Sequence, residues 1–153
     1  MEGIFNTKGN STVPASHTYT PQNEQEAWIA IMQACIAVDG NVADEELDVL
    51  AQTLADKKLF EGHDIMAYSR TVFYAHAQYG SKVLIDQAVD KISAENKATL
   101  FALTIQLVLS DCVVTNKEKE LIQYLYSALD LDTELAHKIV DVVLILNKDS
   151  VCR

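Results

Sequence analysis

The chain has 153 residues, of which 49% are hydrophobic, and this length and composition suit one globular domain with a sizeable core. Acidic residues outnumber basic ones 22 to 12, and the resulting net charge of -10 would repel the phosphate backbone of a nucleic acid. The longest apolar run, at residues 100–109, is about half the length of a membrane-spanning helix. These features exclude nucleic acid as a partner and predict a chain that does not itself span a membrane. No segment directs the chain out of the cytoplasm.

Residues 1–22 carry Gly, Asn, Ser, Thr and Pro without hydrophobic periodicity, which predicts a flexible leader. The folded domain is expected at residues 23–150. Apolar residues recur there at spacings of three and four, and no segment alternates with a period of two. The expected helices lie at about 23–40, 43–57, 63–80, 81–92, 93–110, 115–129 and 132–146.

The fifth expected helix is apolar nearly all round, as a helix surrounded by other helices should be. It is therefore predicted to lie at the centre of the fold, with Leu103 as a core residue. In the third helix, Met66 and Phe73 are expected to face inward together with Val72. In the seventh helix the spacing predicts an inner face, which consists of Leu135, Ile139, Val142, Val143 and Leu146.

Three helix starts carry capping signals. Thr115 and Glu118 form an S/T-x-x-E capping box, in which each residue bonds a backbone amide of the other. Ser81 and Asp132 are expected to cap the fourth and seventh helices.

Two stretches of the chain follow the same plan of an apolar helix, an aspartate, a short loop and an acidic helix start. The first is WIAIMQACIAVDGNVADEE at residues 28–46, and the second is ATLFALTIQLVLSDCVVTNKE at residues 98–118. A shift of 72 positions superimposes Asp39 on Asp111 and Glu46 on Glu118. The sequence therefore predicts an all-α, single-domain bundle of about seven helices, with two pseudo-symmetric helix-loop-helix halves that pack through their apolar helices.

The four duplicated acids have both a structural and a functional interpretation. Glu46 and Glu118 stand near helix starts, where the dipole and free amides stabilise a carboxylate. Asp39 and Asp111 stand near helix ends, where the dipole disfavours an acid, although an Asx-turn would explain each of them. If the two halves bring all four together, a cation or raised pKa values must relieve the repulsion.

A cation at this site would be calcium, magnesium or manganese, because oxygen ligands without nearby His or Cys favour hard ions. The stretch 39–50 does not fit an EF-hand loop, since Ala43 and Leu50 stand where oxygen ligands are required. The candidate metal ligands are Asp39, Glu46, Asp111 and Glu118.

The sequence contains no recognisable catalytic motif. The four histidines form no HExxH arrangement, and the 5 glycines form no phosphate-binding loop. The three cysteines are far apart, without CxxC spacing, and are expected to be Cys35 and Cys112 in the core and Cys152 at the surface. No catalytic residue is assigned, and the protein is expected not to be an enzyme.

The repeated Asp-x-x-Val-x-x-x-Glu, written here as DGNVADEE and DCVVTNKE, resembles the TerB-like tellurite-resistance domain over roughly residues 24–147. The same domain is similar to the N-terminal region of some membrane-anchored DnaJ-like co-chaperones. The resemblance implies seven helices in two pseudo-symmetric halves, acidic loops that bind a divalent metal, and membrane-associated protein partners in a stress response. With no segment that directs the chain elsewhere, the expected location is the cytoplasm, and membrane-associated partners extend it to the inner face of the membrane. In the second copy Cys112 replaces Gly40, so the two loops differ in backbone freedom.

Two classes of function remain open. The first is a metal-binding module for tellurite or chemical stress resistance. The second is a helical interaction scaffold without a metal, in which the acids serve as caps and solvated surface. For either class, the acids Asp44, Glu45 and Asp48 predict a basic or amphipathic protein partner at the first loop, and a homodimer is left open.

Overall fold

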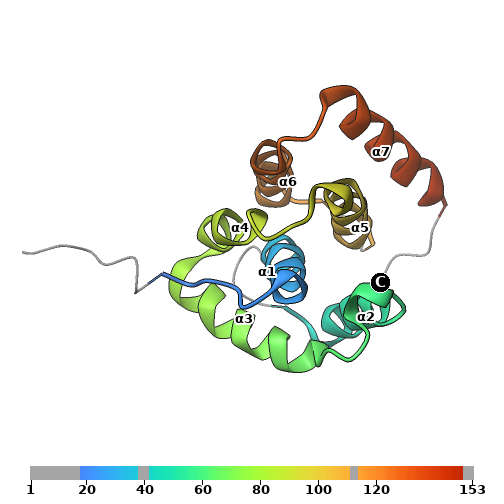
Figure 1. The fold of residues 1–153 in the computed structure, drawn as a ribbon. Coiled ribbons are helices and arrows are strands. Elements are labelled where there is room, and N and C mark those ends of the chain that lie inside the picture. Colours follow the sequence, from blue (N-terminus) through green and yellow to red (C-terminus); the bar gives the residue numbers. More distant parts are fainter. Residues whose placement is uncertain (1–17, 38–41, 111–113, 150–153) are drawn as a thin grey trace, which may run out of the picture.

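The computed structural model describes residues 18–37, 42–110 and 114–149. Within these ranges the chain forms seven α-helices and no β-strand, which confirms the predicted all-α fold (Figure 1). The helices are α1 (Glu24–Ile36), α2 (Asp44–Ala55), α3 (Ile65–Tyr79), α4 (Ser81–Val89), α5 (Lys97–Leu109), α6 (Asn116–Leu129) and α7 (Thr133–Leu146). Two short 3-10 turns, η2 (Lys58–Phe60) and η3 (Ala94–Asn96), precede α3 and α5.

The central helix is α1. Every residue from Glu26 to Ile36 is buried, and α1 contacts α2, α3, α4, α5 and α6. Figure 1 shows α1 enclosed by its neighbours. Three alanines, at positions 27, 30 and 34, allow these neighbours to approach closely on several sides.

The prediction that the fifth helix is the centre is therefore wrong. In α5, Thr99 and Gln106 are exposed and Leu103 is only half-buried, because α7 covers the outer side of α5 only in part. The predicted packing of α1 against α5 is confirmed. None of the helices in the described ranges is long and apolar enough to cross a membrane.

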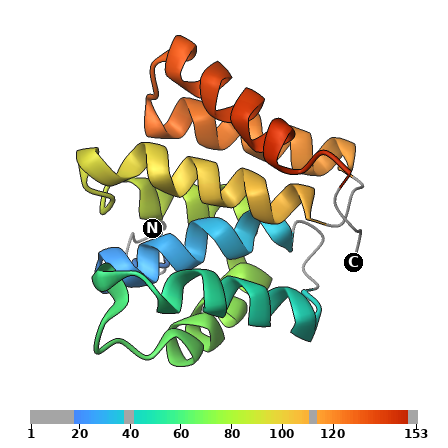
Figure 2. The same ribbon diagram turned by 90° about the vertical axis from the view of Figure 1, so that its right-hand side faces the viewer.

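The remaining helices pack on α1 or on one another. The helices α3 and α4 pack on one side of α1, α4 continues the contact to α6, and α7 packs on α5 at the outside of the bundle. Figure 2 shows α7 and α6 as an outer layer, separated from α2 and α3 by α1 and α5.

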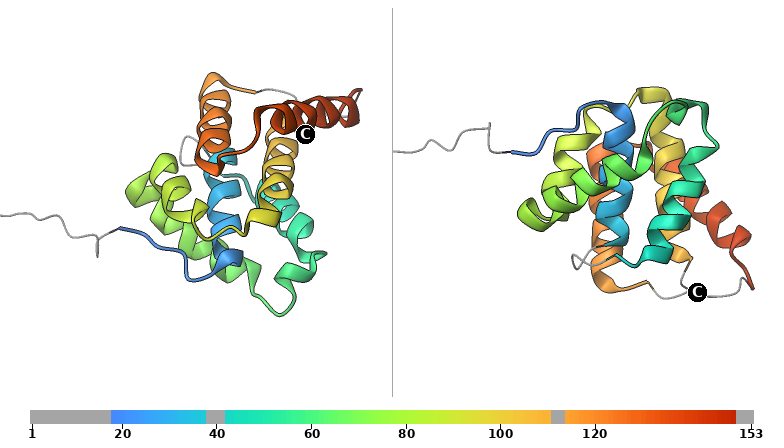
Figure 3. Two further views of the ribbon diagram at one scale, coloured as in Figure 1. Left: turned by 45° about the horizontal axis from the view of Figure 1, so that its top comes forward. Right: turned by 90° about the horizontal axis from the view of Figure 1, so that it is seen from below.

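The internal duplication is visible in the helix boundaries. The second helix of each pair begins at Asp44 and at Asn116, which are 72 residues apart. In Figure 2 the ends of α1 and α5 and the starts of α2 and α6 lie at the same end of the bundle, and the right-hand view of Figure 3 agrees. The joints of the duplicated halves are the connections from α1 to α2 and from α5 to α6, and their described ends therefore lie at the same end of the bundle.

A buried polar contact joins α1 to α3. Ser69 Oγ donates to Gln33 Oε1 at 2.8 Å, and Gln33 Nε2 donates to the Ser69 carbonyl oxygen at 3.3 Å. Both side chains are almost fully buried. This reciprocal pair satisfies polar groups that would otherwise be costly in a core.

The segment before α1 is part of the folded body from residue 18 onward. Tyr19 and Pro21 are buried, and the Tyr19 hydroxyl donates to a carboxylate oxygen of the buried Glu26. Both residues belong to the predicted leader, so the packing against α1 includes residues before the predicted domain start at residue 23. Residues 1–17 of the predicted leader lie outside the described part of the chain.

Several helix faces and caps differ from the sequence predictions. Met66 and Phe73 are 43% and 46% exposed, whereas Val72 is buried as expected. Ser81 does not cap α4, because the N-cap position belongs to Gly80, whose φ of 85° few other residues adopt.

Two predicted caps are confirmed. Asp132 accepts a bond from the Leu135 amide at 3.0 Å, and Thr115 opens α6 with a capping box.

The predicted inner face of α7 is wrong for three of its five residues. Val143 is buried and Ile139 is partly buried, whereas Leu135, Val142 and Leu146 are exposed. The face that packs on α5 is rotated by about one residue from the expected one, because it also includes Ala136.

Candidate functional site

Glu46 lies in the first turn of α2, directly after the loop that follows α1. Its Oε1 accepts a hydrogen bond from the backbone amide of Ala43 at 3.1 Å. Ala43 has no side-chain acceptor of its own, so the Glu46 carboxylate is the side chain that satisfies an amide at this helix start. Two more acids, Asp44 and Glu45, share this turn and are exposed.

Glu118 holds the equivalent position in α6 and makes the equivalent bond. Its Oε1 accepts from the Thr115 amide at 2.9 Å, while the Glu118 amide donates to Thr115 Oγ1 at 3.1 Å. Glu118 is only 7% exposed, so this carboxylate is well inside the bundle. The structural interpretation of Glu46 and Glu118 as helix caps is therefore confirmed.

The two aspartates of the candidate metal site, Asp39 and Asp111, lie outside the described residues. The convergence of Asp39, Glu46, Asp111 and Glu118 consequently stays a prediction. Within the described residues, no group of three His, Cys, Asp or Glu side chains is arranged to hold a metal ion. The described flanks do place both joints at one end of the bundle (Figure 2).

Cys35 lies near the end of α1 and is fully buried, as the sequence predicts. Burial, with a smaller effect from the nearby charge of Glu118, raises the pKa of the Cys35 thiol to about 12. The negative charge of Glu118 lies close enough to act on Cys35 because α6 packs on α1. The end of the first apolar helix and the start of the second acidic helix are thus neighbours.

This thiol is expected to be unreactive in the folded protein. With Cys112→Ser and Cys152→Ser in place, a thiol-specific reagent at about pH 8 should leave Cys35 unmodified, because only the thiolate reacts and burial excludes the reagent. The same chain in denaturant is the control and should react completely. Rapid native-state labelling would contradict the burial of Cys35.

A serine and a histidine also meet at the contact of α1, α3 and α4. Ser81 Oγ donates to the Ala34 carbonyl oxygen at 3.0 Å and lies 2.7 Å from His76 Nε2. Because the hydroxyl has one proton, His76 Nε2 must be the donor in the second contact. A histidine that activates a serine would instead accept from it, so this pair serves as a structural bridge.

At the opposite end of the bundle, the Glu24 carboxylate joins α1 to the start of α5. It accepts bonds from Ser93 Oγ (2.7 Å), Asn96 Nδ2 (2.9 Å), the Ser93 amide (3.1 Å) and Trp28 Nε1 (3.2 Å). No local pattern in the sequence indicates this contact, because Ser93 and Asn96 lie far from Glu24 along the chain.

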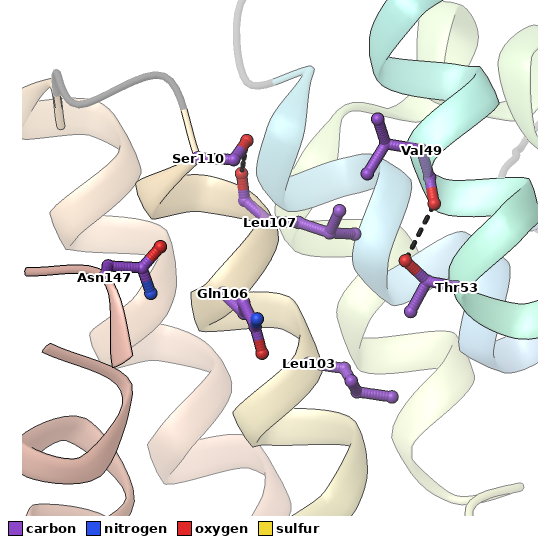
Figure 4. Close-up of a pocket in the computed structure, with 7 residues that line it drawn as sticks. All are labelled: Val49, Thr53, Leu103, Gln106, Leu107, Ser110 and Asn147. Carbon is purple, nitrogen blue, oxygen red and sulfur yellow. Dashed lines mark hydrogen bonds between the residues drawn. The ribbon is translucent and has the colours of Figure 1, made fainter. Parts of the chain in front are cut away.

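A pocket of about 200 Å³ lies between α2 and α5, next to the end of α7 (Figure 4). Thr53 and Ser110 donate their hydroxyl protons to the Val49 and Leu107 carbonyl oxygens of their own helices, both at 2.7 Å. Asn147 similarly donates to the Val143 carbonyl oxygen. These three polar groups already have partners within their own helices.

Two adjoining pockets, of about 450 and 310 Å³, lie between α6 and α7 and share Ile122, Gln123 and Val140. Phe101 and Ile105 of α5 contribute to their lining. They form one largely apolar groove, which exists because α7 packs mainly on α5.

The described part of the site is a pair of equivalent helix caps, and such caps occur in helical proteins of many functions. Assignment to a family therefore depends on comparison with known proteins. Comparisons of the chain with protein-family models, with curated proteins and with solved structures found no match in any of the three.

Proposed function

We propose that the protein is a non-enzymatic, TerB-like helical module that binds a divalent cation at its two joints and acts in tellurite or chemical stress resistance. The observation that supports this proposal best is the equivalence of the two joints. Each begins its second helix with a glutamate that bonds a backbone amide three residues earlier, and the described ends of both joints lie at the same end of the bundle.

The proposed ligands are Asp39 and Asp111 together with Glu46 and Glu118. Each glutamate uses Oε1 for its cap, and a carboxylate has two oxygens with about four acceptor positions. A cap bond and a metal bond are therefore compatible. Four oxygen ligands of this kind suit calcium, magnesium or manganese.

Replacement of Asp39 by Asn tests this site. Asp39→Asn should reduce the rise in melting temperature that millimolar calcium, magnesium or manganese produces, because binding to the native state stabilises by about 2.7 kcal/mol at 100 times Kd. In chelator the variant should be as stable as the parent or more so, since repulsion among the carboxylates falls. Thermal unfolding followed by circular dichroism measures both effects.

Asp48→Asn is the matched control, because Asp48 is exposed on α2 and the substitution removes the same charge. It should leave the cation response intact. An Asp39 that only bonds loop amides would instead cost about 0.5–2 kcal/mol with and without metal. Equal destabilisation of Asp39→Asn in every condition would therefore reject the metal site.

The second candidate is a helical interaction scaffold, which the exposed acids Asp44, Glu45 and Asp48 on α2 favour. A basic or amphipathic partner would dock there, and salt would slow its association. The resemblance to the TerB-like domain implies that the partners are membrane-associated proteins. Such partners and a cytoplasmic location at the inner face of the membrane are both part of the proposal. Binding that survives high salt and reversal of Glu45 would argue against this surface.

A further inference from the structure

The outer face of α7 carries an apolar stripe that no other helix of the described chain covers. Leu135, Val142 and Leu146 are 41%, 53% and 64% exposed, and the half-buried Ile139 lies between them. The neighbouring side of α7, about one residue round the helix, is already occupied, since Val143 is buried against the bundle. The helix is thus apolar on two sides, and a helix of that kind is normally buried on both.

The spacing of the stripe is that of a helix-pairing seam. Its four residues, Leu135, Ile139, Val142 and Leu146, follow one another at intervals of four, three and four, which is the a/d pattern of a coiled coil. Such a seam interlocks with a second helix through side chains inserted between those of the partner.

The seam is complementary to itself. When two copies of α7 lie antiparallel about a two-fold axis between Val140 and Asp141, Leu135 of each copy meets Leu146 of the other. Ile139 then meets Val142 in the same way, so all four seam positions are filled by apolar partners. A two-fold interface requires this kind of self-complementary patch.

The charges beside the seam suit the same arrangement. Lys138 and Asp141 are exposed on the same side of the seam and carry opposite charges. Residues 133–149 carry three acids and two bases, a local charge of -1. Two copies of α7 therefore repel each other little, and a strongly basic partner has little to bind here.

The exposed apolar area is also large enough to matter. The stripe and the adjacent Ile145, which is 71% exposed, present on the order of 500 Å² of aliphatic surface, near the upper end of the 300–600 Å² found on a typical monomer. That is more than half of the roughly 800 Å² that each side of a standard interface buries.

We propose that α7 is a homodimerisation helix, which pairs antiparallel with α7 of a second copy of this chain. The proposal is independent of the metal site and of the proposed function. It also accounts for the sequence prediction that these residues face inward: they face the inside of a dimer.

Light scattering coupled to size exclusion, with sedimentation equilibrium on the full chain, tests the pairing. The parent chain is expected to have twice its mass of 17.0 kDa at about 100 µM. Val142→Lys should weaken the dimer at least about 100-fold, because it places a charge at the centre of the seam in both copies. Val142 is exposed in the single chain, so the variant should keep its helical circular dichroism and melt cooperatively.

Tyr74→Lys is the matched control. Tyr74 is 70% exposed on α3, beside the exposed Phe73, and belongs to a second apolar patch. This variant should remain dimeric. Loss of the dimer in Tyr74→Lys but not in Val142→Lys would overturn the proposal, because it would place the interface on α3.

A parent chain that is monomeric at about 100 µM would overturn the proposal. So would a monomer that binds vesicles of mixed neutral and anionic lipid through α7, which would make the stripe a membrane contact.

Discussion

Replacement of Leu100 by Ala is expected to lower the free energy of unfolding by about 2–5 kcal/mol, the cost of deleting a fully buried leucine side chain. Leu100 is 0% exposed on α5 and holds the position equivalent to Trp28 of α1 in the duplicated halves. Its removal leaves a cavity between the two apolar helices. Urea unfolding followed by circular dichroism at 222 nm measures the loss.

Leu103→Ala is the matched comparison, with the same chemical change one turn further along α5. Leu103 is half-buried and lines the pocket between α2 and α5, so its loss should cost less than half as much. This replaces the sequence-based expectation that Leu103 is a core residue. Equal losses for the two variants would mean that the outer side of α5 is covered more fully than described.

Glu24→Gln is expected to destabilise the protein by about 1.5–3 kcal/mol at neutral pH, the usual value of hydrogen bonds to a charged group. Four donors converge on this carboxylate and join α1 to the start of α5. Burial alone would raise the pKa of Glu24, but the hydrogen bonds from Asn96, Ser93 and Trp28 outweigh it and hold the pKa below its usual value. The folded state therefore favours the charged form.

The pH dependence follows from the direction of that shift. The stabilisation is fully present above the unfolded-state pKa of about 4.3 and is lost as the pH falls through the lower folded-state pKa. The difference between parent and Glu24→Gln should shrink accordingly below about pH 4. Chemical unfolding at a series of pH values measures this difference.

Glu120→Gln is the control for Glu24→Gln. Glu120 is 64% exposed and paired with Lys82, so its loss should cost no more than about 1 kcal/mol. A Glu24→Gln difference that stayed constant with pH would show that the charge of Glu24 contributes nothing.

Local features of the fold were predictable from the sequence because they depend on neighbours in the chain. The capping box of Thr115 and the cap of Asp132 require residues three positions apart, and both are present. The stop of α3 at Gly80 depends on a glycine at a positive φ. Helix number and type were predictable for the same reason, since spacings of three and four define an amphipathic face.

Features that depend on packing between distant segments were not predictable. Periodicity indicated that α1 and α5 are both apolar, but it could not show that α1 is covered on all sides while α5 exposes Gln106. The same limit explains α7, where the pattern marks apolar positions without saying what covers them. At the site, the cap roles of Glu46 and Glu118 were predictable. The contacts of Glu24 were not, because its partners Ser93 and Asn96 follow it by 69 and 72 residues.

The reciprocal bond between Gln33 and Ser69 has a consequence for the uniqueness of the fold. A helix that is apolar on every side can turn about its own axis with little change in buried area, so hydrophobic burial alone would leave several orientations of α1 close in energy. Turning α1 away from α3 would leave the Gln33 amide buried without a partner, at a cost of about 1–3 kcal/mol. The Gln33 amide thus helps to select a single rotation of α1, together with the Glu24 carboxylate, which bonds Ser93 and Asn96 at the start of α5.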